Sequence, residues 1–459
     1  MRNSQLLWHS ALLLLGYLTL ASLQVYDDMS DLRGSYCEYI GCCQNRKDTC
    51  SKPIIGLEVG TLCYCDDFCN RTDVHDCCPD YWSVCWGLEI TTPLPPPTTR
   101  RPPEQITSCT FKNRVYFVNQ TTRDNCKNCR CVPTGVQKVE MMCDPDVCLI
   151  DDEILYAVNA ESHGWTASNY SKFWGETLER GVKYRLGTLQ PKKDVIRMNP
   201  VKRYYDPAML PTHFDSASEW PRYVTGIQDQ EWCGSSWAIS TAAVASDRYG
   251  IISKGREEVQ LSAQNILSCI TRPTGCEGGR LDRAWTFVRK YGVVDEDCFP
   301  YTGNNNTICS IRRFGPLRAS GCTPPRYSER TGRYKVGPAY RLGNETDIMY
   351  EIMRSGPVQA TLRVYHDFFS YKEGIYRHIG ASLPHLQGYH SVRIVGWGEE
   401  FTPMGLKKYW KVANSWGTDW GENGYFRILR GVNECDIESF VLAVWSEVDR
   451  RILTTSYTI

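Results

Sequence analysis

A mostly apolar run extends from Ala11 to Leu20, close to the first methionine. A basic residue, Arg2, precedes the run and the small pair Ala21-Ser22 follows it, an order that is typical of a secretory signal peptide. The run is too short to cross the ~30 Å hydrocarbon layer of a bilayer, and the sequence has no later stretch of about 18 apolar residues. We therefore predict a signal peptide over residues 1–22 and a secreted protein without membrane insertion, the alternative being a membrane anchor.

Two further apolar patterns predict regular elements in the second half of the chain. Apolar side chains at Ile239, Ala242, Ala243 and Tyr249 have the spacing of a buried helix face, and this helix is predicted to begin at Ser236. Residues 392–395 predict a strand. By contrast, the proline-rich stretch from Thr91 to Pro103 can form neither helix nor strand, because its prolines fix φ and lack a donor. We predict an extended linker over residues 88–107.

Length and charge narrow the classes of protein. A chain of 459 residues is too long for one ordinary core, so several domains are expected. Its 52 basic and 52 acidic residues give a formal net charge of zero, which offers no electrostatic reason to expect a nucleic acid as partner.

The 23 cysteines indicate an oxidising compartment and are unevenly distributed. Ten lie between Cys37 and Cys85, six between Cys109 and Cys148, and seven between Cys233 and Cys435. Two small modules held by disulfides should therefore precede a larger domain. Zinc is the alternative for the first module, but histidine is scarce there, so we expect no metal and no cofactor.

Five sequons predict N-linked glycans on a secreted chain. They are Asn70, Asn119, Asn169, Asn305 and Asn344.

Residues far apart in the sequence suggest a site for nucleophilic chemistry. The run Gln230-Glu-Trp-Cys233-Gly-Ser-Ser236-Trp237 leads into the predicted helix, whose positive end would stabilise negative charge at its first residue. His390 precedes the predicted strand, and Asn414-Ser-Trp416-Gly lies downstream. A histidine oriented by a third polar group is the partner that a nucleophile requires.

These motifs resemble those of the papain family of cysteine proteases, in the family's order from about Pro211 to Val448. The resemblance implies an α+β, papain-like fold in which a helical and a β-rich subdomain face each other across a cleft. It assigns Ser236 to the nucleophile, His390 to the catalytic histidine and Asn414 to its orienting partner, and it includes Gln230 among the catalytic residues. It also places Trp237, Gly278, Gly279, Trp416 and Phe440 along the cleft.

The resemblance departs from the family at Ser236, where the family has cysteine. An alcohol is far too weak an acid to form the thiolate–imidazolium pair on which these enzymes depend, so we expect hydrolysis to be lost. Phe440 stands where cathepsin B has a carboxylate, and the stretch from Thr302 lacks the two adjacent histidines of the cathepsin B loop. The expected protein is a pseudoenzyme with vestigial catalytic residues.

The upstream segments carry further resemblances. The cysteines of residues 36–87 resemble a somatomedin B-like module, those of residues 108–150 resemble a von Willebrand factor C-like module, and residues 151–209 are similar to the propeptide of cathepsin B. With the pseudoprotease domain at residues 210–459, this order resembles the tubulointerstitial nephritis antigen family. The resemblance implies a matrix or basement-membrane glycoprotein that binds matrix components or cell-surface receptors.

The papain-family resemblance and the odd number of cysteines also imply three bridges in the last domain and a free Cys435. The implied pairs are Cys233 with Cys276, Cys269 with Cys309, and Cys298 with Cys322. Two alternative functions stay open, an active secreted peptidase and a soluble ligand carrier.

Overall fold

The computed structural model describes residues 35–54, 62–70, 76–88, 108–135, 138–161, 163–270, 275–304, 308–312, 314, 317, 332–380, 388–402 and 405–446. The predicted signal peptide, nearly all of the predicted linker, Asn305 and Cys322 lie outside these residues. The chain divides into two compact units, Met1–Glu104 and Gln105–Ile459. Within the described part, no helix is long and apolar enough to cross a membrane.

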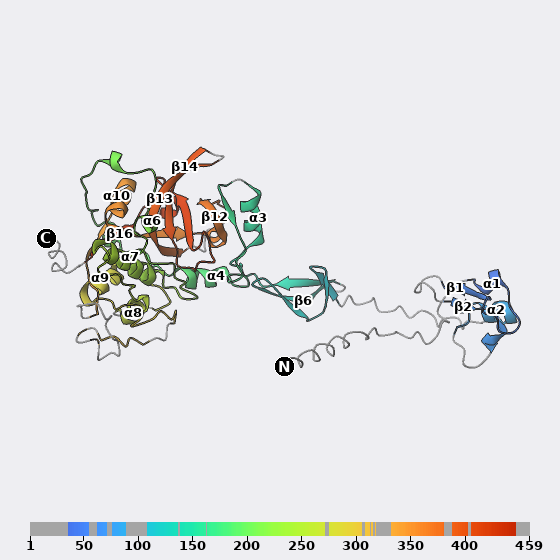
Figure 1. The fold of residues 1–459 in the computed structure, drawn as a ribbon. Coiled ribbons are helices and arrows are strands. Elements are labelled where there is room, and N and C mark those ends of the chain that lie inside the picture. The colour runs from blue at the N-terminus through green and yellow to red at the C-terminus, as the bar shows by residue number, and fades with distance from the viewer. Residues whose placement is uncertain are drawn as a thin grey trace, which may run out of the picture. The chain divides into compact units, whose positions relative to one another are not determined.

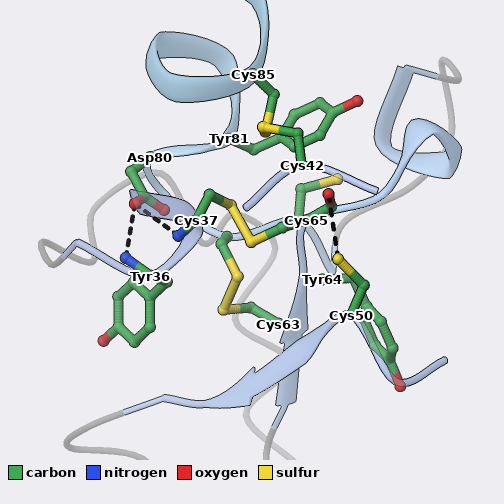
Figure 2. Close-up of a disulfide and its surroundings, with 12 residues drawn as sticks. Tyr36, Cys37, Cys42, Cys50, Cys63, Tyr64, Cys65, Asp80, Tyr81 and Cys85 are labelled. Carbon is green, nitrogen blue, oxygen red and sulfur yellow. Dashed lines mark hydrogen bonds between the residues drawn. A yellow bond between two sulfur atoms is a disulfide. The ribbon is translucent and has the colours of Figure 1, made fainter. Parts of the chain in front are cut away.

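The first unit is a small knot in which cysteine supplies most of the core. Its elements are α1 (Cys37–Ile40), β1 (Ser51–Pro53), β2 (Leu62–Tyr64), η2 (Asp67–Asn70) and α2 (Tyr81–Trp86). Five disulfides join Cys37 to Cys65, Cys42 to Cys85, Cys43 to Cys50, Cys63 to Cys78, and Cys69 to Cys77. The Asp80 carboxylate accepts hydrogen bonds from the backbone amides of Tyr36 and Cys37, at 2.6 and 2.8 Å, and so fixes the start of α1 against α2 (Figure 2).

The second cysteine module consists of two small antiparallel sheets. β3 (Ser108–Phe111) pairs with β4 (Arg114–Phe117), and β6 (Lys127–Gly135) lies between β5 (Thr121–Asp124) and β7 (Lys138–Cys143). Disulfides join Cys109 to Cys131, Cys126 to Cys148, and Cys129 to Cys143. All sixteen cysteines upstream of residue 150 are therefore paired with one another.

The segment that is similar to a propeptide forms short elements. They are α3 (Asp152–Ala160), β8 (Trp165–Ala167), α4 (Leu178–Gly181), the π-helical turn η3 (Val182–Leu186), α5 (Lys193–Ile196) and η4 (Pro207–Met209). Asp151 caps α3, since its side chain accepts the amide hydrogens of Glu153 and Ile154.

The papain-like domain combines a group of helices with a large sheet (Figure 1). Its helices are α6 (Ser216–Glu219), α7 (Ser236–Ile252), α8 (Ala263–Cys269), α9 (Leu281–Tyr291) and α10 (Glu345–Ser355), with the 3₁₀ turns η6 (His366–Ser370) and η7 (Glu434–Asp436). Its strands are β9 (Phe214–Asp215), β10 (Val336–Arg341), β11 (Val358–Val364), β12 (Tyr371–Tyr376), β13 (Gly388–Thr402), β14 (Gly405–Ala413), β15 (Tyr425–Leu429) and β16 (Val441–Ser446).

The sheet has nine strands in the order β10-β16-β11-β13-β14-β15-β12-β8, with β9 paired to β13. β8 comes from the propeptide-like segment and pairs with β12, so this segment extends the sheet of the papain-like domain. The predicted strand at residues 392–395 lies inside β13.

Helix α7 begins at Ser236, as predicted, and runs through the interior of the domain. Ile239, Ala242 and Tyr249 are buried, whereas Ala243 is only partly buried. The helix carries many small residues, and the hydroxyl groups of Ser240 and Thr241 donate to carbonyl groups four residues earlier. These two hydroxyl groups are thus satisfied within the helix.

Candidate functional site

Ser236 lies at the first residue of α7 and is fully buried. Its Oγ lies 2.9 Å from Oγ1 of Thr188 and accepts the amide hydrogen of Ser391 at 3.4 Å. Thr188 belongs to the propeptide-like segment. The hydroxyl group of Ser236 is therefore held by hydrogen bonds to two other residues.

His390 lies in β13 and is also fully buried. Its Nε2 lies 2.7 Å from Oδ1 of Asn414, and its ring centroid lies 5.2 Å from that of Trp416. Because Asn414 Oδ1 also accepts the amide hydrogen of Ser415, it is the acceptor, and Nε2 carries the hydrogen.

Burial lowers the pKa of His390 to about 4, and the hydrogen bond with Asn414 only partly offsets this effect. The imidazole is therefore neutral at pH 7. Its Nδ1 has no hydrogen-bond partner of normal geometry, although the Leu186 carbonyl is close enough to favour the charged form. Among the described residues, no hydrogen bond connects His390 with Ser236.

Gln230 is buried, and its amide hydrogens are already donated to other residues. Nε2 donates to the carbonyl oxygens of Leu186 at 3.3 Å and Cys233 at 2.8 Å, while Oε1 accepts from the hydroxyl group of Ser415 at 2.7 Å. Oxyanion stabilisation requires a donor that points to an empty position. Here the carbonyl group of Leu186, in the propeptide-like segment, already accepts a hydrogen bond from Gln230 Nε2.

The propeptide-like segment lies across the cleft between its two walls. Thr188 donates its amide hydrogen to Tyr389 on one side, and Leu189 donates to Gly279 on the other. The bridge between Thr188 and Gly279 is parallel, and that between Thr188 and Tyr389 is antiparallel. The segment therefore covers the residues that the sequence placed in one site.

Two glycines permit the closest approach of the segment to the domain. A Cβ atom at Gly187, where φ is +98°, would lie 2.1 Å from the carbonyl oxygen of Gly234. A Cβ atom at Gly278, where φ is +101°, would lie 2.8 Å from the carbonyl oxygen of Gly187. Larger residues at either position would separate the segment from the domain.

Phe440 is 5% exposed and packs in the hydrophobic cluster around α7, together with Trp237. The structure thus shows Phe440 as a core residue at this position.

Three residues that the sequence analysis did not single out hold the site together. Tyr301 donates its hydroxyl hydrogen to the carbonyl of Gln230 at 3.0 Å. Arg185 pairs with Asp229 at 2.7 Å, and Thr188 contacts Ser236. No local sequence pattern indicates these contacts, because each joins segments that are more than 40 residues apart.

The structure joins Cys233 to Cys276 and Cys269 to Cys309, the first two implied pairs. Cys298 also belongs to a disulfide, but its implied partner Cys322 lies outside the described residues. Among the described cysteines, Cys435 is free.

The structure leaves three of the predicted glycan sites exposed, namely Asn119, Asn169 and Asn344. Asn344 caps α10 through Oδ1, which accepts from Asp347, so its Nδ2 is available for a glycan. The side chain of Asn70 and the whole of Asn305 lie outside the described part.

Within the described residues, the one group of potential metal ligands is formed by Cys37, Cys65 and Cys78. All three sulfur atoms belong to disulfides, so none of them is a thiolate that could bind zinc.

The comparisons with known proteins agree with this geometry. Residues 210–445 match the model of the papain family cysteine proteases. Among solved structures, procathepsin B S9 from Trypanosoma congolense is 32% identical, with a TM-score of 0.55, and the match covers 66% of this chain and 99% of that one. Procathepsin L2 of Tenebrio molitor, 24% identical with a TM-score of 0.50 over 64% of this chain and 89% of that one, supports the fold alone.

The fold and the site thus define a protein with a papain-family domain. Human tubulointerstitial nephritis antigen-like is 45% identical over 438 residues, which cover 91% of this chain and 90% of the relative. Bovine tubulointerstitial nephritis antigen is 43% identical, over 90% of this chain and 88% of the relative. The chain therefore belongs to the tubulointerstitial nephritis antigen family within the papain-like proteins.

Proposed function

We propose that the protein is a secreted, non-catalytic glycoprotein of the extracellular matrix whose papain-like domain is a folded scaffold. One observation supports the proposed loss of catalysis. The hydroxyl group at the position that the family resemblance assigns to the nucleophile, Ser236, is hydrogen-bonded to Thr188 and to the amide of Ser391.

The chemistry of an alcohol supports this proposal. A serine nucleophile needs a base that removes its proton during attack, and the base must lie within hydrogen-bonding distance. His390 is oriented by Asn414 but makes no hydrogen bond to Ser236. The segment over the cleft also denies a peptide access to both residues.

Secretion is supported by the signal-like N-terminal sequence and by the disulfides. Eight bridges hold the two upstream modules, and such bonds persist in oxidising compartments. We propose that these modules provide the binding surfaces for matrix proteins or cell-surface receptors. Retention in the matrix distinguishes this function from that of a soluble carrier.

The first test measures turnover of a fluorogenic dipeptide substrate by the purified full-length protein. We expect no hydrolysis above background, and the same baseline for Ser236→Ala and His390→Ala. Turnover that disappears in both variants would establish an active peptidase instead.

The second test follows the secreted protein in cell culture. We expect the full chain to remain in the extracted matrix, and a chain without residues 36–104 to pass into the medium in larger amounts. Equal release of both forms would remove the first module from the proposal, and complete release of the full chain would favour the soluble carrier.

A further inference from the structure

The propeptide-like segment contacts both the second cysteine module and the papain-like domain. We infer that residues 147–189, which we call the joint, hold the module on the papain-like domain through non-covalent contacts with the domain that do not depend on the connecting chain. A cut in residues 190–200, which we call the strap, then leaves a stable two-chain complex. This inference does not depend on the missing nucleophile.

The first attachment connects the cysteine module with the joint. Asn125, in a left-handed backbone conformation, accepts the amide hydrogen of Gly175 at 2.8 Å and donates to the carbonyl of Ile150 at 2.7 Å. Arg123 donates to the carbonyl of the same Gly175 at 2.5 Å. One turn of the module thus binds both backbone groups of one residue of the joint.

A short backbone ladder strengthens this attachment. Leu149 donates to Glu176, and Leu178 donates to Val147, both at 2.8 Å, on either side of Cys148. Cys148 is bonded to Cys126, so the ladder is covalently tied to the module. The whole module is therefore anchored at the point where the joint begins.

The second attachment connects the joint with the papain-like domain through backbone pairing. β8 pairs with β12, and the indole of Trp165 donates to the carbonyl of Arg377 at 2.9 Å. The hydroxyl group of Tyr170 donates to the carbonyl of Tyr371 and accepts the amide hydrogen of Gly421. These bonds lie outside the cleft and do not use the residues of the candidate site.

The third attachment is a buried aromatic and charged contact. Phe173 is fully buried against Trp416, Trp232 and Phe369, with its ring 5.7 Å from that of Trp416. The Arg185 guanidinium lies 4.7 Å from the ring of Trp232 and pairs with Asp229. Buried aromatic and arginine anchors of this kind dominate the energetics of stable interfaces.

The strap is more exposed than the joint, although Val195 packs against the hydrophobic cluster around α7. Lys192, Lys193 and Arg197 are exposed, and the basic pair Lys192-Lys193 is a cleavage site for trypsin-like proteases. Its carbonyl at Ile196 accepts a hydrogen bond from Arg341 at 2.9 Å. Beyond the strap, Arg203 pairs with the buried Glu351 at 3.0 Å, which protects the second basic pair, Lys202-Arg203.

Because no described disulfide connects residues before 190 with residues after 200, a cut strap leaves only non-covalent contacts. The test uses the full chain with a recognition sequence for a specific viral protease, flanked by glycine and serine, in place of residues 191–197. Complete cleavage is followed on a denaturing gel without reducing agent, where the two fragments must separate. We expect one species in gel filtration after cleavage. Two separately eluting fragments would overturn the inference.

Two variants of the cleavable chain test the anchor. Arg185→Ala removes a buried side chain of the joint, and Glu179→Ala removes an exposed carboxylate of the same segment. We expect the cleaved Arg185→Ala complex to dissociate on dilution at a concentration at least tenfold higher than cleaved Glu179→Ala. Equal dissociation of the two variants would show that Arg185 is not an anchor. If Arg185→Ala does not fold, gel filtration of the cleaved parent chain still tests the inference.

Discussion

At Ser236 the family resemblance places a thiol, but the neighbouring residues bind a hydroxyl group. Thr188 and the amide of Ser391 both hydrogen-bond to its oxygen. Sulfur is larger and forms weaker hydrogen bonds, so a cysteine would fit these partners less well. The substitution therefore changes what the residue binds as well as its reactivity.

We predict that Ser236→Cys restores little activity. The covering segment remains in place, Phe440 offers no carboxylate, and the imidazole is buried with a pKa of about 4. Turnover of the dipeptide substrate should stay at least about 100-fold below that of an active enzyme of the family, equivalent to about 3 kcal/mol of transition-state stabilisation. Efficient cleavage by this variant would show that the cleft lacks only the sulfur atom.

Burial of His390 also predicts a pH dependence of stability. The folded pKa of about 4 lies below the ordinary value of 6.5, so the unfolded chain binds a proton at this ring at higher pH than the folded chain. The free energy of unfolding should therefore fall as the pH is lowered from about 6.5 to about 4, by at most about 3 kcal/mol from this residue.

Urea unfolding of the papain-like domain at several pH values, followed by tryptophan fluorescence, measures this fall. His390→Gln should show a smaller decrease than the parent chain over the same interval. His366→Gln is the control for a second buried histidine whose pKa is also lowered by burial. An unchanged slope in His390→Gln would contradict the assignment to His390.

The exposed sequons give a prediction for the secreted chain. We expect at least three of the five to carry a glycan, including Asn119, Asn169 and Asn344, because their side chains face solvent. Enzymatic removal of N-glycans should lower the mass, and each Asn→Gln variant should lack one increment. An unchanged mass after this treatment would contradict the prediction.

At the scale of elements, the sequence predicted the start of α7 and the strand after His390, because both have strong local patterns. It did not predict that β8 joins the sheet through β12. Residues 165–167 are too few to show a strand period, and their pairing depends on residues more than 200 positions away. Local periodicity carries no information about such a partner.

The joint allows an element-scale prediction with a matched control. Phe173→Ala removes a fully buried ring and should destabilise the docking of residues 165–189 by about 3–5 kcal/mol. Trp174→Ala removes a neighbouring ring that is 41% exposed and should have a much smaller effect. Hydrogen exchange of the peptides that cover this segment measures both, and equal protection in the two variants would contradict the role of Phe173.

At the scale of the molecule, the sequence identified the cysteine-rich regions and the papain-like domain, because cysteine density and motif order are visible in one dimension. The ten cysteines of the first module allow many pairings, and only the structure gives one. The attachment of the second module to the propeptide-like segment could not be predicted either, since Asn125 and Arg123 are ordinary polar residues in the sequence.

Reduction of the disulfides should affect the module of residues 36–87 more strongly than the papain-like domain. The core of residues 36–87 consists mainly of cysteines, so reducing agent should unfold this module. The papain-like domain has large apolar clusters and should keep its near-ultraviolet circular dichroism under mild reduction. If the first module and the papain-like domain unfolded at the same concentration of reductant, this result would contradict the prediction that different interactions stabilise them.

The pairing of β8 with β12 has a practical consequence for experiments on fragments. A chain that begins at residue 210 lacks β8 and so leaves the outer edge of β12 with unpaired backbone donors and acceptors. Open edges of this kind pair with other chains and promote aggregation. Recombinant forms of the papain-like domain should therefore begin upstream of residue 108, where β8 and the module that holds it are both retained, if they are to stay monomeric at high concentration.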